Sequence, residues 1–193
     1  ICQKACIFIY NLKQTKMTTN QLNKEFDHLE SIRSKVFEPV KLQLHVGIPG
    51  FNSPDTYGIY RKSGGECLGT VGNKFEPANL HRYMDFITKS ICEDGSGFFD
   101  LNSLNFEEFF GGSKVSFTIE SKDFEVESPV LGDVFKTKIH FITGFDGRTK
   151  NHLTWSTKRL TCKNGAKSWK TELDLSYKNT QGNVGKLELF TEE

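Results

Sequence analysis

The second half of the chain alternates apolar and polar residues with a period of two, beginning at Lys114. This alternation is typical of β-strands that bury one face. Four runs show it, with apolar residues at these positions: Val115, Phe117 and Ile119; Phe135, Ile139 and Phe141; Leu153 and Trp155; Trp169, Leu173, Leu175 and Tyr177. A change of phase before Leu160 and Cys162 predicts a β-bulge at that point.

Turn sequences separate these runs, and Asp-Gly and Asn-Gly pairs are strong signals for tight hairpins. Leu187 and Leu189 could open one more strand. The sequence therefore predicts an antiparallel meander of four or five strands after Gly112, whose bulky rings turn inward. The turns are predicted at Phe145-Asp146-Gly147-Arg148, Asn164-Gly165 and Gly182-Asn183.

The first half has apolar residues at steps of three and four, which indicates amphipathic helices. The first helix is predicted to start at a capping box formed by Thr18 and Gln21 and to end before Pro39. Its apolar positions are Leu22, Phe26, Leu29, Ile32, Val36 and Phe37.

Two more helices are predicted, one beginning with Pro77 at its first position and one following Ser103 and ending at Gly111-Gly112. Their apolar faces contain Leu80, Tyr83, Met84, Ile87 and Ile91, and then Leu104, Phe106, Phe109 and Phe110. Between the first two helices, residues 41–46 predict a strand and residues 47–56 a loop. Residues 57–71 predict a hairpin that turns at Ser63-Gly64-Gly65.

Together these elements predict an α+β fold, in which N-terminal helices pack on a curved C-terminal antiparallel β-meander. The 193 residues suit one domain, which we place at residues 18–193. Residues 1–17 are interpreted as an N-terminal extension or the remnant of a signal sequence, and the residues do not decide between the two.

Charge and composition restrict the classes of partner and the cellular compartment that the sequence suggests. A net charge of +1, from 25 basic and 24 acidic residues, argues against nucleic acid. The basic residues of one hairpin, interpreted as a solvated face, are Lys158, Arg159, Lys163, Lys167 and Lys170. No apolar run is long enough to span a bilayer. The five scattered cysteines fit neither a disulfide framework nor a zinc site. This favours an intracellular protein, and secretion stays open.

The motifs of the sequence predict neither a bound metal nor a cofactor. Residues 92–103 resemble an EF-hand loop, but the first carboxylate and the final glutamate are missing, so the loop is interpreted as a simple connection. The histidines have no ligand spacing, and no phosphate-binding glycine motif occurs. The aromatic residues that could line a pocket are Tyr57, Tyr60, Trp155, Trp169 and Tyr177. The ligand-contacting candidates are Tyr60, Tyr83 and Trp155, because each combines an apolar ring with a polar group.

The segments NHLTWSTKRLTCK, NGAK and SWKTELDLSY, together with FFGG leading into KVSFTIES, resemble the nuclear transport factor two-like (cone-fold) superfamily over residues 18–178. The resemblance implies a bent sheet around a helix, a conical pocket, and association of two copies through the sheet face. Some members are enzymes with an Asp, His or Tyr inside the cone. No motif of theirs matches here, so the catalytic candidates Tyr60, Asp85 and His140 rest on residue type alone.

The favoured function is therefore a non-catalytic domain that binds a small apolar ligand or a protein partner, with a homodimer through the sheet face as one form of partner. One alternative is a cone-pocket enzyme, of isomerase, dehydratase or hydrolase type, acting on a small hydrophobic substrate. The other is a secreted lipocalin-like recognition protein.

Overall fold

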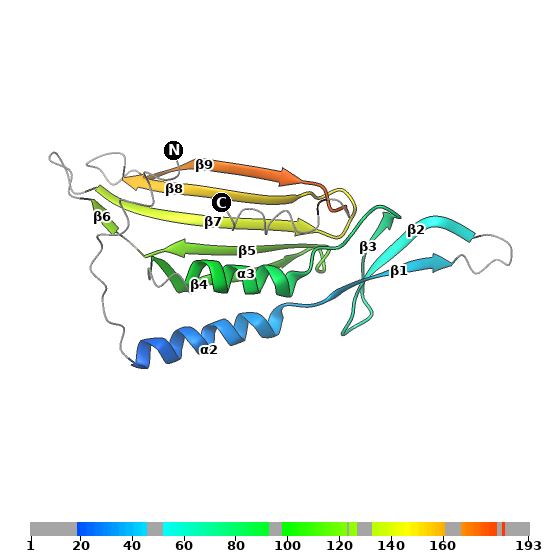
Figure 1. Cartoon of the computed structure of the whole chain (residues 1–193), viewed down its shortest axis with the longest axis horizontal. Helices are drawn as coiled ribbons and strands as arrows, with labels where there is room; N and C mark the ends of the chain where they lie inside the picture. The colour runs from blue at the N-terminus through cyan, green and yellow to red at the C-terminus, as the bar shows by residue number, and fades with distance from the viewer. Residues whose placement is uncertain are drawn as a thin grey trace.

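The computed structural model describes residues 19–45, 52–92, 98–122, 124–126, 133–160, 167–180 and 183. Within them the chain forms two helices and two antiparallel sheets (Figure 1). The α+β class predicted from the sequence is confirmed. Residues 1–17, the turn at 164–165 and the predicted strand around Leu187 and Leu189 lie outside the described residues.

The larger sheet contains six strands, in the order β4-β5-β7-β8-β9 with β6 paired to β7. Neighbouring strands are antiparallel, so the predicted meander is present. The strands are β4 (Phe99–Phe109), β5 (Lys114–Ser121), β6 (Phe124–Val126), β7 (Asp133–Gly144), β8 (Asn151–Leu160) and β9 (Lys167–Tyr177).

The helix predicted after Ser103 is wrong, because this segment is strand β4. Leu104 and Phe106 are buried at alternate positions, as in a strand, and β4 pairs along β5. Phe110, Gly111 and Gly112 have positive φ, so the glycines form a hairpin turn instead of ending a helix. Leu104, Phe106, Phe109 and Phe110 include spacings of two, three and four residues, which fit either period. Only pairing with β5 selects the strand.

A bulge is present in the pairing of β8 with β9 between Trp155 and Ser156, before Leu160 as the sequence predicts, but the extra residue belongs to β9 and not to β8. Leu173 pairs with Trp155 and Thr171 pairs with Ser156, so Glu172 is the extra residue. One extra residue moves every later side chain to the other side of a sheet. Trp169 therefore does not lie on the same side as Leu173 and Leu175, contrary to the predicted inward alternation.

The smaller sheet contains β1 (Pro39–His45), β2 (Asn52–Arg61) and β3 (Cys67–Gly72), in that order. The predicted hairpin is confirmed, with Gly65 at positive φ in its turn. The predicted loop at 47–56 is too long, since β2 begins at Asn52. There Asn52 pairs with His45 of β1, and Pro54 lies within the register shift between this pair and the pair of Tyr57 with Gln43, where a proline is tolerated.

The two helices are α2 (Thr19–Lys35) and α3 (Leu80–Cys92). Asn79, and not Pro77, precedes the first turn of α3, because its Oδ1 accepts a hydrogen bond from the backbone N–H of Arg82 at 3.1 Å. On α2, Phe26 is exposed although its spacing predicts it on the apolar face, whereas Ile32 is buried, as is Val36 just after the helix. The capping box at Thr18 and Gln21 lies outside the side chains that the structure describes.

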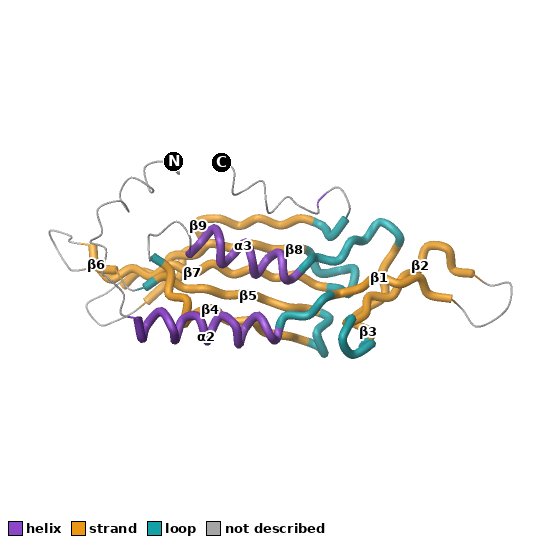
Figure 2. The backbone as a smooth tube through the Cα atoms, turned by 60° about the horizontal axis from the view of Figure 1, so that its bottom comes forward, coloured by secondary structure: helices purple, strands orange, loops and turns teal. Residues whose placement is uncertain are grey.

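Both helices lie on one side of the larger sheet, which we call the helix side (Figure 2). His28 of α2 contacts the carbonyl oxygen of Leu104 at 2.8 Å, and Tyr83 of α3 stacks on Phe141 with ring centroids 4.0 Å apart. Arg33 and Asp85 join the helices at 3.0 Å. The opposite surface of the sheet is called the far side.

One hydrophobic core contains residues from both helices and both sheets. Arg61 of β2 forms ion pairs with Glu108 of β4 and with Glu66, and its guanidinium lies 4.1 Å from the centroid of the Phe37 ring. A Cβ placed on Gly69 of β3 would collide with the carbonyl oxygen of Phe145. The smaller sheet therefore packs directly against one end of the larger one.

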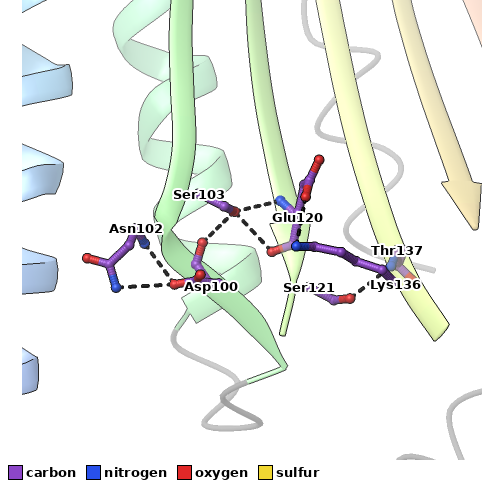
Figure 3. A network of polar contacts seen from close by, with 7 residues as sticks. All are labelled: Asp100, Asn102, Ser103, Glu120, Ser121, Lys136 and Thr137. Atoms are coloured by element: carbon purple, nitrogen blue, oxygen red, sulfur yellow. Dashed lines mark hydrogen bonds and ion pairs between the residues drawn. The ribbon is translucent and has the colours of Figure 1, made fainter. Parts of the chain in front are cut away.

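Polar contacts hold the other end of the larger sheet, where the pairing of β4 and β5 shifts between Asp100 and Asn105 (Figure 3). The Ser103 hydroxyl donates to the carbonyl of Asp100 at 2.6 Å and accepts from the backbone N–H of Glu120 at 2.8 Å. Ser121 Oγ accepts from the N–H of Thr137 at 2.8 Å. These hydroxyls satisfy backbone groups that the irregular ladder leaves without strand partners.

Candidate functional site

Strands β8 and β9 carry three successive pairs of facing residues on the helix side. These pairs are Asn151 with Tyr177, Leu153 with Leu175, and Trp155 with Leu173. Directly opposite residues in an antiparallel pair lie on the same side of the sheet. The surface thus changes from polar to apolar along the strands, and we call these six residues the β8–β9 ladder.

The polar end of the ladder is joined to helix α3. The hydroxyl of Tyr177 lies 3.0 Å from the hydroxyl of Tyr83. Burial raises the pKa of Tyr177, and the hydrogen bonds with Tyr83 and Asn151 oppose this rise without reversing it. The phenol is therefore neutral at physiological pH and can both donate and accept.

Two buried amides lie at this polar end. Asn151 is 4% exposed and Asn179 is 5% exposed. The Asn179 amide donates to the carbonyl oxygen of Gly144 at 3.0 Å and to the hydroxyl of Thr143 at 3.4 Å. Within the described part of the chain, no donor reaches Oδ1 of either asparagine. A buried acceptor without a donor costs about 1–3 kcal/mol, so this end of the ladder favours a hydrogen-bond donor.

The apolar end of the ladder is only half covered. Trp155 is 39% exposed and Leu173 is 41% exposed. Neither belongs to the hydrophobic core, although Ile139 and Leu153 beside Trp155 pack against it. An exposed apolar pair that continues from the core is a typical contact surface for a ligand or partner.

The structure brings two of the three predicted ligand residues to this side of the sheet. Tyr83 contacts the polar end of the ladder and Trp155 forms part of its apolar end. Tyr60 lies elsewhere, on β2 of the smaller sheet, where its ring lies next to Gly58. No alternation in the sequence indicated that β2 belongs to a separate sheet.

The three catalytic candidates lie on three different elements, and no described contact joins any two of them. Asp85 pairs with Arg33 at 3.0 Å on the surface of α3. His140 lies on the far side of β7, where burial first and then the nearby Lys138 lower its pKa. Tyr60 belongs to the smaller sheet. This placement provides no acid–base pair, because proton transfer needs groups within hydrogen-bond reach.

Other candidate features of the described residues are possible metal ligands, cysteines and membrane-spanning helices. No three His, Cys, Asp or Glu side chains among them gather as metal ligands. Asp100 and Ser103, from the loop that resembles an EF-hand, belong to β4, where Asp100 bonds to Asn102 and Ser103 bonds to Asp100 and to Glu120 of β5. Residues 93–97 lie outside the described residues. Cys67 is a free, exposed thiol. No described helix has the length and apolar character required to cross a membrane.

Comparison with known proteins adds no functional information. No family model, no curated protein and no solved structure matches the chain.

Sequence reasoning missed Asn151, Asn179 and the pairing of Leu173 with Trp155. Asn151 was detectable, because it lies two residues before Leu153 and four before Trp155, in phase with the buried side of β8. A polar residue at a core-facing position is an informative exception. Asn179 follows β9 outside any periodic run, so no pattern could have indicated it.

Proposed function

We propose that this domain binds a small amphipathic molecule, with an apolar body and a hydroxyl or amide group, along the β8–β9 ladder. The observation that carries the proposal is the order of the three pairs, with a buried polar end and a half-exposed apolar end on one surface. Small-molecule sites commonly combine an apolar lining with a few polar groups that fix orientation.

The dimensions of the ladder suit a small ligand. Asn151 and Trp155 are four residues apart, which corresponds to about 13 Å along a strand. A ligand of that length would place its polar group at the end of the ladder formed by Asn151 and Tyr177, and its apolar body against Leu153, Leu175, Trp155 and Leu173. Completing the burial of a leucine or tryptophan side chain supplies hydrophobic free energy, at roughly 25 cal/mol per Å².

The proposal includes the cone-like arrangement suggested by the sequence, in which the larger sheet bends around the helices. The contacts of α2 with β4, and those of Tyr83 with Phe141 and Tyr177, support it. A protein partner on the same apolar surface, including a second copy of this chain, is the competing occupant. Sedimentation of the purified protein distinguishes the two, since a partner copy makes the apparent mass depend on concentration.

Tryptophan fluorescence tests the ligand directly. In the Trp169→Phe variant Trp155 is the only tryptophan, because the chain has two. We expect 1-decanol to shift its emission to shorter wavelength in a saturable manner. Leu173→Glu should weaken this binding at least tenfold, because a charge then lies in the apolar end. Leu42→Glu is the matched control, since Leu42 is an exposed leucine on β1, and it should leave binding unchanged.

The polar end is tested by comparing 1-decanol with its methyl ether, which has no donor. Asn151→Ala should reduce the preference for the alcohol about tenfold, because the acceptor is removed. Tyr177→Phe is the second variant if Asn151→Ala does not fold, and circular dichroism identifies that case. A Trp155 emission that neither probe changes would rule out the proposal.

A further inference from the structure

The far side of the larger sheet carries a cluster of cations around one aromatic ring. Trp169 of β9 pairs with Lys158 of β8, and Lys138 of β7 pairs with Ser156 next to it. The Nζ atoms of Lys158 and Lys138 lie 5.3 and 5.9 Å from the centroid of the Trp169 ring. The ring is 44% exposed, so the cluster is accessible. We call these three residues the Lys–Trp cluster.

The two lysines have no carboxylate partner among the described residues. Their neighbour Lys136 differs, because its Nζ lies 3.0 Å from Glu120 (Figure 3). Lys170 likewise pairs with Glu172 at 3.1 Å. Glu120 faces Lys138 across β5 and β7, but its carboxylate is paired with Lys136. Two ammonium groups are thus brought to one ring without an ion pair of their own among the described contacts. Like charges repel each other, and an anion that contacts both ammonium groups would offset that repulsion.

Hydroxyl groups border the same surface. Ser156 and Thr171 pair with each other on the far side, adjacent to the pair formed by Lys158 and Trp169. Ammonium and hydroxyl groups are the usual donors to phosphate and sulfate oxygens. The indole ring adds a flat apolar surface for a sugar or aromatic ring next to the anion.

We propose that the Lys–Trp cluster binds a small phosphate or sulfate monoester, with the oxyanion between Lys138 and Lys158 and its organic part beside Trp169. A phosphate monoester carries up to about two negative charges at pH 7 and so matches two ammonium groups, whereas a sulfate monoester carries one. The chain as a whole has a net charge of only +1, which argues for a small anion and against an extended polyanion. This site lies on the opposite side of the sheet from the β8–β9 ladder and does not depend on it.

Trp169 itself reports on this site. In the Trp155→Phe variant Trp169 is the only tryptophan, and glucose 6-phosphate, glucose 6-sulfate and glucose serve as probes at constant ionic strength. We expect either charged ester to change the Trp169 emission in a saturable manner, and glucose to have no effect. Comparing the two esters separates phosphate from sulfate recognition. Identical, non-saturating responses to all three probes would overturn the proposal.

The double variant Lys138→Gln/Lys158→Gln should lose at least tenfold in affinity. Lys74→Gln/Lys150→Gln is the matched control, because both lysines are exposed and lie away from the cluster. This double substitution removes the same amount of charge. An equal loss in both double variants would show nonspecific attraction and contradict the site. Lys138→Arg/Lys158→Arg should retain binding, and a thermal melt establishes that each variant is folded.

Discussion

The helix side of the larger sheet has two halves with the same alternating pattern and different burial. On β5 and β7, Phe117 and Phe141 are buried between the sheet and the helices, and their rings lie 6.4 Å apart. On β8 and β9, Trp155 and Leu173 keep about two fifths of their surface exposed. The same sequence pattern thus builds a core in one half and a contact surface in the other, depending on what covers it.

The largest expected effect is a difference in stability between the two halves. Phe117→Ala should lower the free energy of unfolding by about 3–5 kcal/mol, since it leaves a cavity next to Phe106 and Phe141. Leu173→Ala should lower it by only about 0.5–1 kcal/mol, because the side chain is half exposed. Urea denaturation of both variants measures the contrast. Equal losses would mean that Leu173 belongs to the core.

A smaller effect on stability is expected at the end of the buried half, where β3 packs against the larger sheet. Gly69→Ala should lower the free energy of unfolding by about 1–3 kcal/mol, because the new methyl group meets the carbonyl oxygen of Phe145. Gly72→Ala on the same strand is the matched control. A Cβ there finds only the carbonyl oxygen of Asp55, at 4.0 Å, so thermal denaturation should separate the two variants.

The smallest expected effect is a dependence of stability on pH that comes from His140. This residue lies on the far side of β7, next in sequence to the buried Phe141. Burial, followed by the charge of Lys138, lowers the pKa of His140 below its ordinary value of 6.5. The unfolded chain therefore binds a proton more readily, and stability is lost as the pH falls from about 6.5 through the folded pKa. His140→Gln should remove this part of the acid-side loss.

Urea denaturation at a series of pH values measures the slope for both proteins, and their difference isolates His140 from titrating carboxylates. Parallel slopes would show that the His140 imidazole is as well solvated in the folded chain as in the unfolded one.

Much of the fold could be predicted because burial and period agree locally. On β5, Val115, Phe117 and Ile119 alternate without interruption, and all three are buried. The Phe145–Arg148 turn was recognisable because Asp146 accepts hydrogen bonds from the N–H groups of Arg148 and Thr149 at 2.9 and 2.7 Å. Such a turn uses only neighbouring residues.

The candidate site was predictable only in part. Tyr83 and Trp155 could be selected as aromatic residues with polar groups, but their sharing of one side with Asn151 and Tyr177 depends on the placement of α3 and the register of β8. Tyr60 has the same chemistry, and its location in the smaller sheet follows from pairing between β1, β2 and β3. Residue type alone cannot distinguish these positions.

The sequence by itself determined the alternation of the strands, the two amphipathic helices and the tight turns, because each depends on residues close together in the chain. Tertiary structure decided that residues 99–109 pair with β5 as a strand and that the bulge at Glu172 places Trp169 on the far side. Both outcomes depend on register with a partner strand. The register is set by all the contacts between two paired segments, so neither segment specifies it alone.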